Sequence, residues 1–164
     1  MTIARDLLWG ALALGTVTGM RSMLAPTLVS RALAEHPHID QMGEPARTLA
    51  MPRTRHLLTP LAASELIGDK LPFAPDRTIS ASMAVRAVSG GLTAAALASA
   101  RRQPILLPAL LGAVAACASA SIGLRLRKRY GRSGALANAA LGSLEDCLAV
   151  TIGNAGLRRA IGKS

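Results

Sequence analysis

Five charged side chains interrupt apolar segments of this sequence: Arg21, Arg86, Glu145 and Asp146 lie in long ones and Glu65 in a shorter one. An ionised side chain at the middle of a bilayer costs about 2.5–3.5 kcal/mol, so such residues face one another or a wet cavity. Guanidinium groups bind carboxylates and phosphates through paired hydrogen bonds, and carboxylates hold cations or protons. These residue types predict either an ion or solute site inside an apolar bundle, or ion pairs that hold helices in register.

The spacing of these residues limits how they can be arranged. Glu65 and Asp69 are four residues apart and share one helix face, where they could chelate a cation, share a proton or flank an arginine. Glu145 and Asp146 diverge by about 100° on a helix, so only one of them can point at a central axis. We expect the substrate- or ion-binding site to consist of Arg21, Ser22, Glu65, Asp69, Lys70, Arg86, Glu145 and Asp146.

Residues for covalent catalysis are not arranged in any recognisable pattern. The sequence has no Ser-His-Asp, Cys-His, P-loop or HExxH arrangement. Histidine, the commonest general base, is absent from the core of the long apolar runs. We therefore expect no catalytic residue, no metal site and no cofactor, and an enzyme is the less favoured interpretation.

The apolar runs are long enough to be membrane helices, since crossing a bilayer takes about 20 residues. A shorter segment, His56 to Asp69, contains Pro60 and predicts a tilted, half-length or re-entrant helix. Residues 1–164 are expected to form one all-α integral membrane domain, a polytopic bundle. Its four clear spans are predicted at Leu7–Leu33, Ile79–Ala100, Pro104–Leu124 and Ser133–Leu157.

Connections and packing faces follow from local composition. The polar, proline-containing stretch Glu35–Arg55 predicts a loop, and the basic residues from Arg125 to Arg132 predict an interfacial loop. Small residues recur at four-residue spacing, which is typical of close helix packing in lipid. These are Gly15 and Gly19, then Gly90, Ala94 and Ala98, then Gly112, Ala116 and Ala120.

The overall composition agrees with a membrane protein. Apolar residues make up 51 % of the chain, charged residues 17 %, and the mean hydropathy is +0.36. A soluble domain of this size has too little interior for so much apolar surface. Aromatic residues are 2 % and make no stacking platform, so the net charge of +10 predicts contact with anionic lipid headgroups and no nucleic-acid partner. If five segments cross, eight basic residues lie on each side, which permits dual insertion and an antiparallel homodimer.

Four short motifs carry a family resemblance. They are Gly19-Met20-Arg21-Ser22 with Pro26, Glu65-Leu66-Ile67-Gly68-Asp69-Lys70-Leu71-Pro72, Arg86 with Gly90, and Leu144-Glu145-Asp146. Through them nearly the whole chain resembles a group of small bacterial inner-membrane proteins classified as a domain of unknown function, number 4126 in that series. The resemblance implies a multi-pass helical protein of the bacterial inner membrane and supplies no activity. The chain departs from the family pattern around Ala46 to Pro60, where members carry a longer apolar span.

Three functions are compatible with this pattern. The favoured one is a transporter or channel for a small ion or anionic solute, in which arginines attract the anion and carboxylates carry coupling ions. The second is a lipid-phosphate-active membrane enzyme, whose carboxylates would bind a divalent metal. The third is a non-catalytic membrane scaffold with structural salt bridges.

Overall fold

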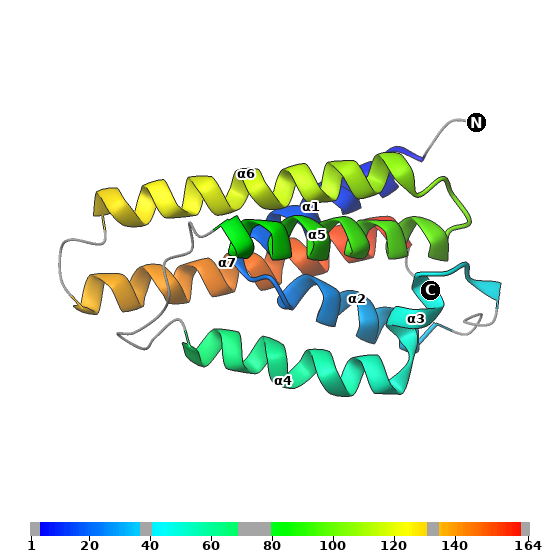
Figure 1. Cartoon of the computed structure of the whole chain (residues 1–164), viewed down its shortest axis with the longest axis horizontal. Coiled ribbons are helices and arrows are strands. Elements are labelled where there is room, and N and C mark those ends of the chain that lie inside the picture. The colour runs from blue at the N-terminus through cyan, green and yellow to red at the C-terminus, as the bar shows by residue number, and fades with distance from the viewer. Residues whose placement is uncertain (1–3, 37–40, 69–79, 131–134, 162–164) are drawn as a thin grey trace.

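The computed structural model describes residues 4–36, 41–68, 80–130 and 135–161, and within these ranges it is all-helical, as predicted. No β-strand occurs in the described part of the chain. The described residues form seven α-helices: α1 Arg5–Met20, α2 Leu24–Ala34, α3 Ala46–Ala50, α4 Pro52–Gly68, α5 Ser80–Ala100, α6 Leu106–Tyr130 and α7 Ala135–Ile161 (Figure 1).

The three C-terminal helices follow the predicted apolar runs. Helices α5 and α7 match Ile79–Ala100 and Ser133–Leu157 to within a few residues, and α6 begins two residues after Pro104. The predicted basic loop is wrong for its first residues, because α6 continues through Arg125 and ends at Tyr130. Lysine and arginine are good helix formers, and their positive charge is favourable near a helix C-terminus.

The predicted single span from Leu7 to Leu33 is wrong, because the chain turns back within it. Helix α1 ends at Met20, and α2 starts at Leu24 and runs in the opposite direction (Figure 1). A Cβ atom placed on Gly153 of α7 would lie 3.6 Å from Val17 of α1 and 2.7 Å from Leu28 of α2. Residues before and after the turn thus lie at the same height along α7. We call residues 5–34 the hairpin and residues 21–23 the hairpin tip.

Local chemistry explains where the second half of the hairpin starts. Pro26 lies in the first turn of α2, where a residue without an N–H group is tolerated because first-turn N–H groups have no intrahelical acceptor. Arg21 is extended, with φ −139° and ψ 106°, and closes α1 by donating its N–H to Val17 O at 2.8 Å. The tip therefore separates two helices with a sharp change of direction.

Small residues set the close packing around α1, as their spacing predicted. A Cβ atom added to Gly15 would lie 2.5 Å from Gly112 O, and one added to Gly112 would lie 2.5 Å from Gly90 O. Backbones of α1, α5 and α6 are therefore in direct contact at these glycines. Helix α6 continues well past this contact to Tyr130, so the hairpin tip lies partway along the longest helices (Figure 1).

The predicted loop Glu35–Arg55 instead contains α3 and the beginning of α4. Ala46 fits against α5, where its N–H donates to Ser99 Oγ at 3.0 Å. Helix α4 is continuous over Pro52–Gly68 with Pro60 inside it, and it packs antiparallel to α2. The hydroxyls of Thr27 and Ser30 donate to the carbonyl oxygens of Leu58 and Leu49 respectively.

Among the described residues, two helices are long and apolar enough to cross a membrane. They cover Ser82–Ala100, with mean hydropathy 1.3, and Leu106–Leu126, with mean hydropathy 1.8. Half of the first is buried inside the protein, whereas 17 % of the second is buried. Helix α6 therefore presents an apolar surface to its surroundings, including Leu106 at 72 % and Val114 at 66 % exposure.

Candidate functional site

A carboxylate from α4 lies on the N-terminal end of α2. Glu65 accepts hydrogen bonds from Ser22 N at 2.8 Å, Ser22 Oγ at 2.6 Å and Met23 N at 2.9 Å. N–H groups at the start of a helix have no intrahelical partner, and the helix dipole is positive there. Glu65 thus occupies the position at which helix N-termini bind free anions.

A guanidinium from α5 lies on the C-terminal end of α1. Arg86 is 5 % exposed, and its Nη1 donates to Gly19 O at 2.6 Å and to Thr18 O at 3.4 Å. Carbonyl groups in the last turn of a helix need such a donor, and the dipole is negative there. Arg86 Nη2 also lies 3.9 Å from Glu65 Oε1. Opposite charges therefore complement the opposite ends of the two helices at the tip.

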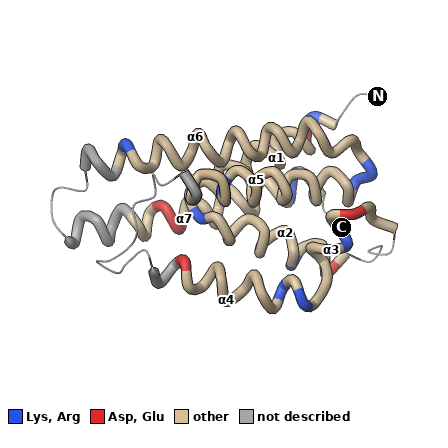
Figure 2. Tube along the Cα trace, viewed as in Figure 1, with Lys and Arg blue, Asp and Glu red and all other residues tan. Residues whose placement is uncertain are grey.

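Arg21 joins the hairpin tip to α7 and α4. Its side chain is 2 % exposed, its Nε donates to Asp146 Oδ1 at 2.6 Å, and its Nη1 donates to Glu65 O at 3.5 Å. Figure 2 shows acidic residues on α7 and on the described end of α4. The structure thereby brings together charges that are distant in the sequence.

Ser89 belongs to this cluster and was missed by the sequence analysis. Its Oγ donates to Ser22 O at 2.7 Å, so it supports the backbone at the turn. The available signal was its position three residues after Arg86, which places both residues on one face of α5. We call Arg21, Ser22, Glu65, Arg86, Ser89 and Asp146 the tip cluster.

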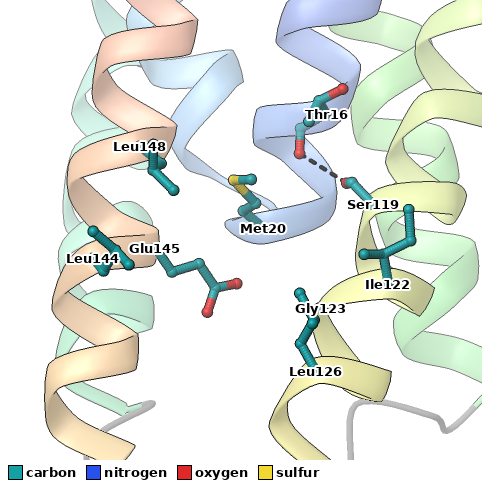
Figure 3. A pocket seen from close by; sticks show the side chains of 9 residues that line it. All are labelled: Thr16, Met20, Ser119, Ile122, Gly123, Leu126, Leu144, Glu145 and Leu148. Atoms are coloured by element: carbon teal, nitrogen blue, oxygen red, sulfur yellow. Dashed lines mark hydrogen bonds between the residues drawn. The ribbon is translucent and has the colours of Figure 1, made fainter. Parts of the chain in front are cut away.

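Not every predicted site residue lies in the tip cluster. Glu145 extends instead into a separate pocket between α6 and α7 (Figure 3). The divergence of neighbouring carboxylates on a helix explains this, since Asp146 is directed toward Arg21. Asp69 and Lys70 lie outside the described residues.

Two largely apolar pockets flank the tip cluster. One has a volume of about 280 Å³ and reaches the end of α1 at Met20. The other has a volume of about 440 Å³, lies between α2, α4 and α5, and reaches Met23 and Ser89. A ligand of the tip cluster could thus approach from either side of the hairpin.

The described residues contain no group of three or more His, Cys, Asp or Glu side chains placed to hold a metal ion. Their polar groups at the tip instead combine two guanidiniums, two carboxylates, two hydroxyls and helix-end backbone groups. Such a set can bind a small charged solute by exchanging its internal contacts for contacts with that solute. No family model, curated protein or solved structure matches this chain.

Proposed function

We propose that the protein is a multi-pass membrane protein that passes a small ion or anionic solute through the tip cluster. In this proposal α4, α5, α6 and α7 cross the bacterial inner membrane, and the hairpin enters and leaves from one side. The apolar surface of α6 supports a lipid environment, since large exposed patches of this kind are rare on soluble monomers. The resemblance to an inner-membrane family remains an expectation that agrees with this placement.

The observation that carries the proposal is the carboxylate of Glu65 on the N-terminus of α2. Its three donors, Ser22 N, Ser22 Oγ and Met23 N, match what a free carboxylate or similar anion requires. The carboxylate of Glu65 thus occupies a binding position at the N-terminus of α2 that a solute anion also fits. Interrupted helices whose ends bind ions are a recurring device of membrane transporters.

Exchange between Glu65 and a solute anion follows from the charges around the N-terminus of α2. When α4 carries Glu65 away, Ser22 and Met23 accept the solute anion, and Arg86 remains nearby to balance its charge. The movement of Glu65 breaks its hydrogen bonds to Ser22 and Met23 and weakens its attraction to Arg86, and a solute anion compensates by making the same contacts. When Glu65 returns, it competes with the anion for the same donors and releases it.

A structural scaffold is the second candidate, because the contacts within the tip cluster already pair positive with negative groups. Arg21 contacts Asp146, and Arg86 contacts both Glu65 and the end of α1. In a scaffold these contacts would never open. The two functions therefore differ in whether Glu65 exchanges with solutes.

The test is anion flux into liposomes that contain the purified protein, measured with small carboxylates and halides. We expect anion flux above that of protein-free liposomes. We expect Glu65→Gln to change this flux at least tenfold, because the side chain that competes with the solute anion loses its charge. Glu44→Gln is the matched control, since Glu44 is exposed, lies outside the tip cluster and contacts Arg47. Its flux should equal that of the wild type.

The scaffold is favoured if no anion passes and none stabilises the detergent-purified protein against heat. A ligand present at a hundred times its Kd should stabilise the folded state by about 2.7 kcal/mol, which is readily measured. Equal flux for wild type, Glu65→Gln and Glu44→Gln would contradict the role given to the tip cluster.

A further inference from the structure

The pocket between α2, α4 and α5 is an apolar groove on the outside of the bundle. Helix α4 packs on α2 and α3, and a space of about 440 Å³ remains between it and α5. Met23 and Pro26, at the start of α2, line this space, and Leu58 lines it from α4. Val88 and Leu92 of α5 are more than half exposed, so the space is open to the surroundings. We call it the α4–α5 groove.

The hydroxyl groups of the α4–α5 groove are already used within the protein. Thr54 Oγ1 donates to Thr48 O at 2.7 Å. Thr93 Oγ1 donates to Ser89 O at 2.7 Å, and Ser89 Oγ donates to Ser22 O at 2.7 Å. Among the described residues that line the groove, none is charged. The walls therefore offer an occupant mainly van der Waals contacts, which suit a hydrocarbon chain.

The length of the groove equals the depth of one bilayer leaflet. It extends along α5 from Ala84 to Thr93, and this stretch of helix rises about 14 Å. The hydrocarbon core of a bilayer is about 30 Å thick, so one leaflet is about 15 Å deep. The groove begins beside the hairpin tip at Met23 and ends at Leu49 of α3. In the proposed membrane placement it thus runs from the middle of the bundle to one surface, as a lipid acyl chain does.

Basic residues gather at the outer end of the groove. There Ala46 N donates to Ser99 Oγ, and Ser30 Oγ donates to Leu49 O, so α2, α3 and the end of α5 meet. Residues 31–36, 41–58 and 98–106 lie around this end and hold six arginines against two acidic residues, namely Arg31, Arg47, Arg53, Arg55, Arg101 and Arg102 against Glu35 and Glu44. Figure 2 shows the basic residues at the start of α4 and after α5. This excess of positive charge favours an anionic group at the outer end.

We propose that the α4–α5 groove binds one anionic phospholipid. One acyl chain lies along α5, and the phosphate lies beside Arg53 and Arg55, which flank the groove residue Thr54 in the sequence. Guanidinium groups suit a phosphate because they donate paired hydrogen bonds to it. The inference rests on the membrane placement of the proposed function, but it does not depend on anion passage through the tip cluster.

Native mass spectrometry of the full chain in a neutral maltoside detergent tests the site by counting bound lipids. The probe is dioleoylphosphatidylglycerol. Dioleoylphosphatidylcholine has the same acyl chains without net charge, and glycerol 3-phosphate has the phosphate without the chains. We expect saturable binding of one phosphatidylglycerol per chain and at least tenfold weaker binding of the other two compounds.

A bulky side chain in the groove should displace the acyl chain. Val88 lines the groove and is 60 % exposed, so Val88→Trp fills part of this space. We expect this variant to bind phosphatidylglycerol at least tenfold more weakly. Val114→Trp is the matched control, because Val114 is 66 % exposed on α6, outside the groove, and its affinity should equal that of the wild type.

A second pair of variants tests the headgroup. The double change Arg53→Gln and Arg55→Gln should lower the affinity for phosphatidylglycerol at least tenfold, to that for phosphatidylcholine. Arg158→Gln with Arg159→Gln removes the same charge from the exposed end of α7 and should leave both affinities unchanged.

Four results would overturn the inference. Equal affinity of the wild type for the two phospholipids would contradict an anionic headgroup, and equally tight binding of glycerol 3-phosphate would show an anion site that does not use the groove. Unchanged phosphatidylglycerol binding by folded Val88→Trp would place the acyl chain elsewhere. A change from dimer to monomer in that variant, with lipid binding unchanged, would show that a second copy covers the groove.

The design separates this inference from anion passage. If Val88→Trp does not fold, the arginine variants and the comparison of the three compounds decide the outcome. Lipid binding without anion flux would contradict the proposed function alone. Anion flux without specific lipid binding would contradict the lipid site alone.

Discussion

Arg21 has the largest fully buried side chain of the described chain, and its contact with Asp146 makes a strong prediction. Removing one partner of a buried ion pair costs about 3–5 kcal/mol, because the other charge stays buried without compensation. We expect Arg21→Gln to lower the free energy of unfolding by about this amount. Asp146→Asn should cost at least as much, since the charge that it leaves behind is that of Arg21, whose side chain is 2 % exposed against 22 % for Asp146. In a double-mutant cycle, measured by chemical unfolding in detergent, the double variant should lose less than the sum.

The exposed pair of Arg159 and Asp6 is the control for this cycle. Its side chains are 61 % and 56 % exposed, although its Nε to Oδ1 distance of 3.1 Å is also short. Exposed pairs contribute about 0–1 kcal/mol, so Arg159→Gln should have a small effect. Strictly additive losses for Arg21 and Asp146 would contradict the description of the tip cluster.

At the residue scale the sequence predicted most of the charges in the tip cluster but not their partners. The cost of burying charge identified Arg21, Glu65 and Arg86. Which of Glu145 and Asp146 would join them depends on how α7 is rotated about its own axis. That rotation is set by packing against α1, where a Cβ atom on Gly156 would come within 2.6 Å of Ala13, and packing of this kind is not visible in a single sequence.

At the scale of elements, apolar runs predicted α5, α6 and α7 because each run corresponds to one helix. The same reasoning failed for residues 7–33, which are apolar on both sides of Arg21. The turn there depends on Glu65 and Arg86, which satisfy the two helix ends from other parts of the chain. Pro26 was the local signal, because proline is typical of the first turn of a helix.

The close contact of α1, α5 and α6 predicts a large effect of one added methyl group. Gly112→Ala places a Cβ atom 2.5 Å from Gly90 O and 2.7 Å from Ala94 Cβ, so backbones must move apart. Overpacking of this kind costs about 1–3 kcal/mol, and we expect a loss in that range by chemical unfolding in detergent. Gly142→Ala, which meets nothing within 4 Å, should be neutral or slightly stabilising. Similar losses for both variants would contradict the packing described at Gly112.

At the scale of the molecule, the hairpin changes the predicted topology. It returns the chain to the end where it began, so α1 and the segment after α2 lie at the same end of the bundle (Figure 1). With Cys117 and Cys147 replaced by alanine, Asp6→Cys and Gln41→Cys should react with an impermeant maleimide from the same side of the membrane. Acidic residues contribute little to orientation, so the change at Asp6 should not alter insertion.

Arg125→Cys reports on the opposite end of α6 and should react from the other side. If residues 7–33 crossed the membrane once, Asp6→Cys and Gln41→Cys would react from opposite sides. Reaction of each cysteine from both sides would indicate two orientations of the same chain.

A hairpin that turns back in the middle of the bundle also constrains how the protein is made. The ribosome delivers residues 5–34 before the residues that contact them, yet in the proposed membrane placement Arg21 and the turn cannot rest in lipid alone without exposing a charge and uncovered helix ends. Their partners emerge later, with Ser22 and Glu65 separated by 43 residues and Arg21 and Asp146 by 125. In that placement the hairpin is made before its partners but reaches its final place only with them, and until α7 arrives it depends on the insertion machinery or waits at the membrane surface.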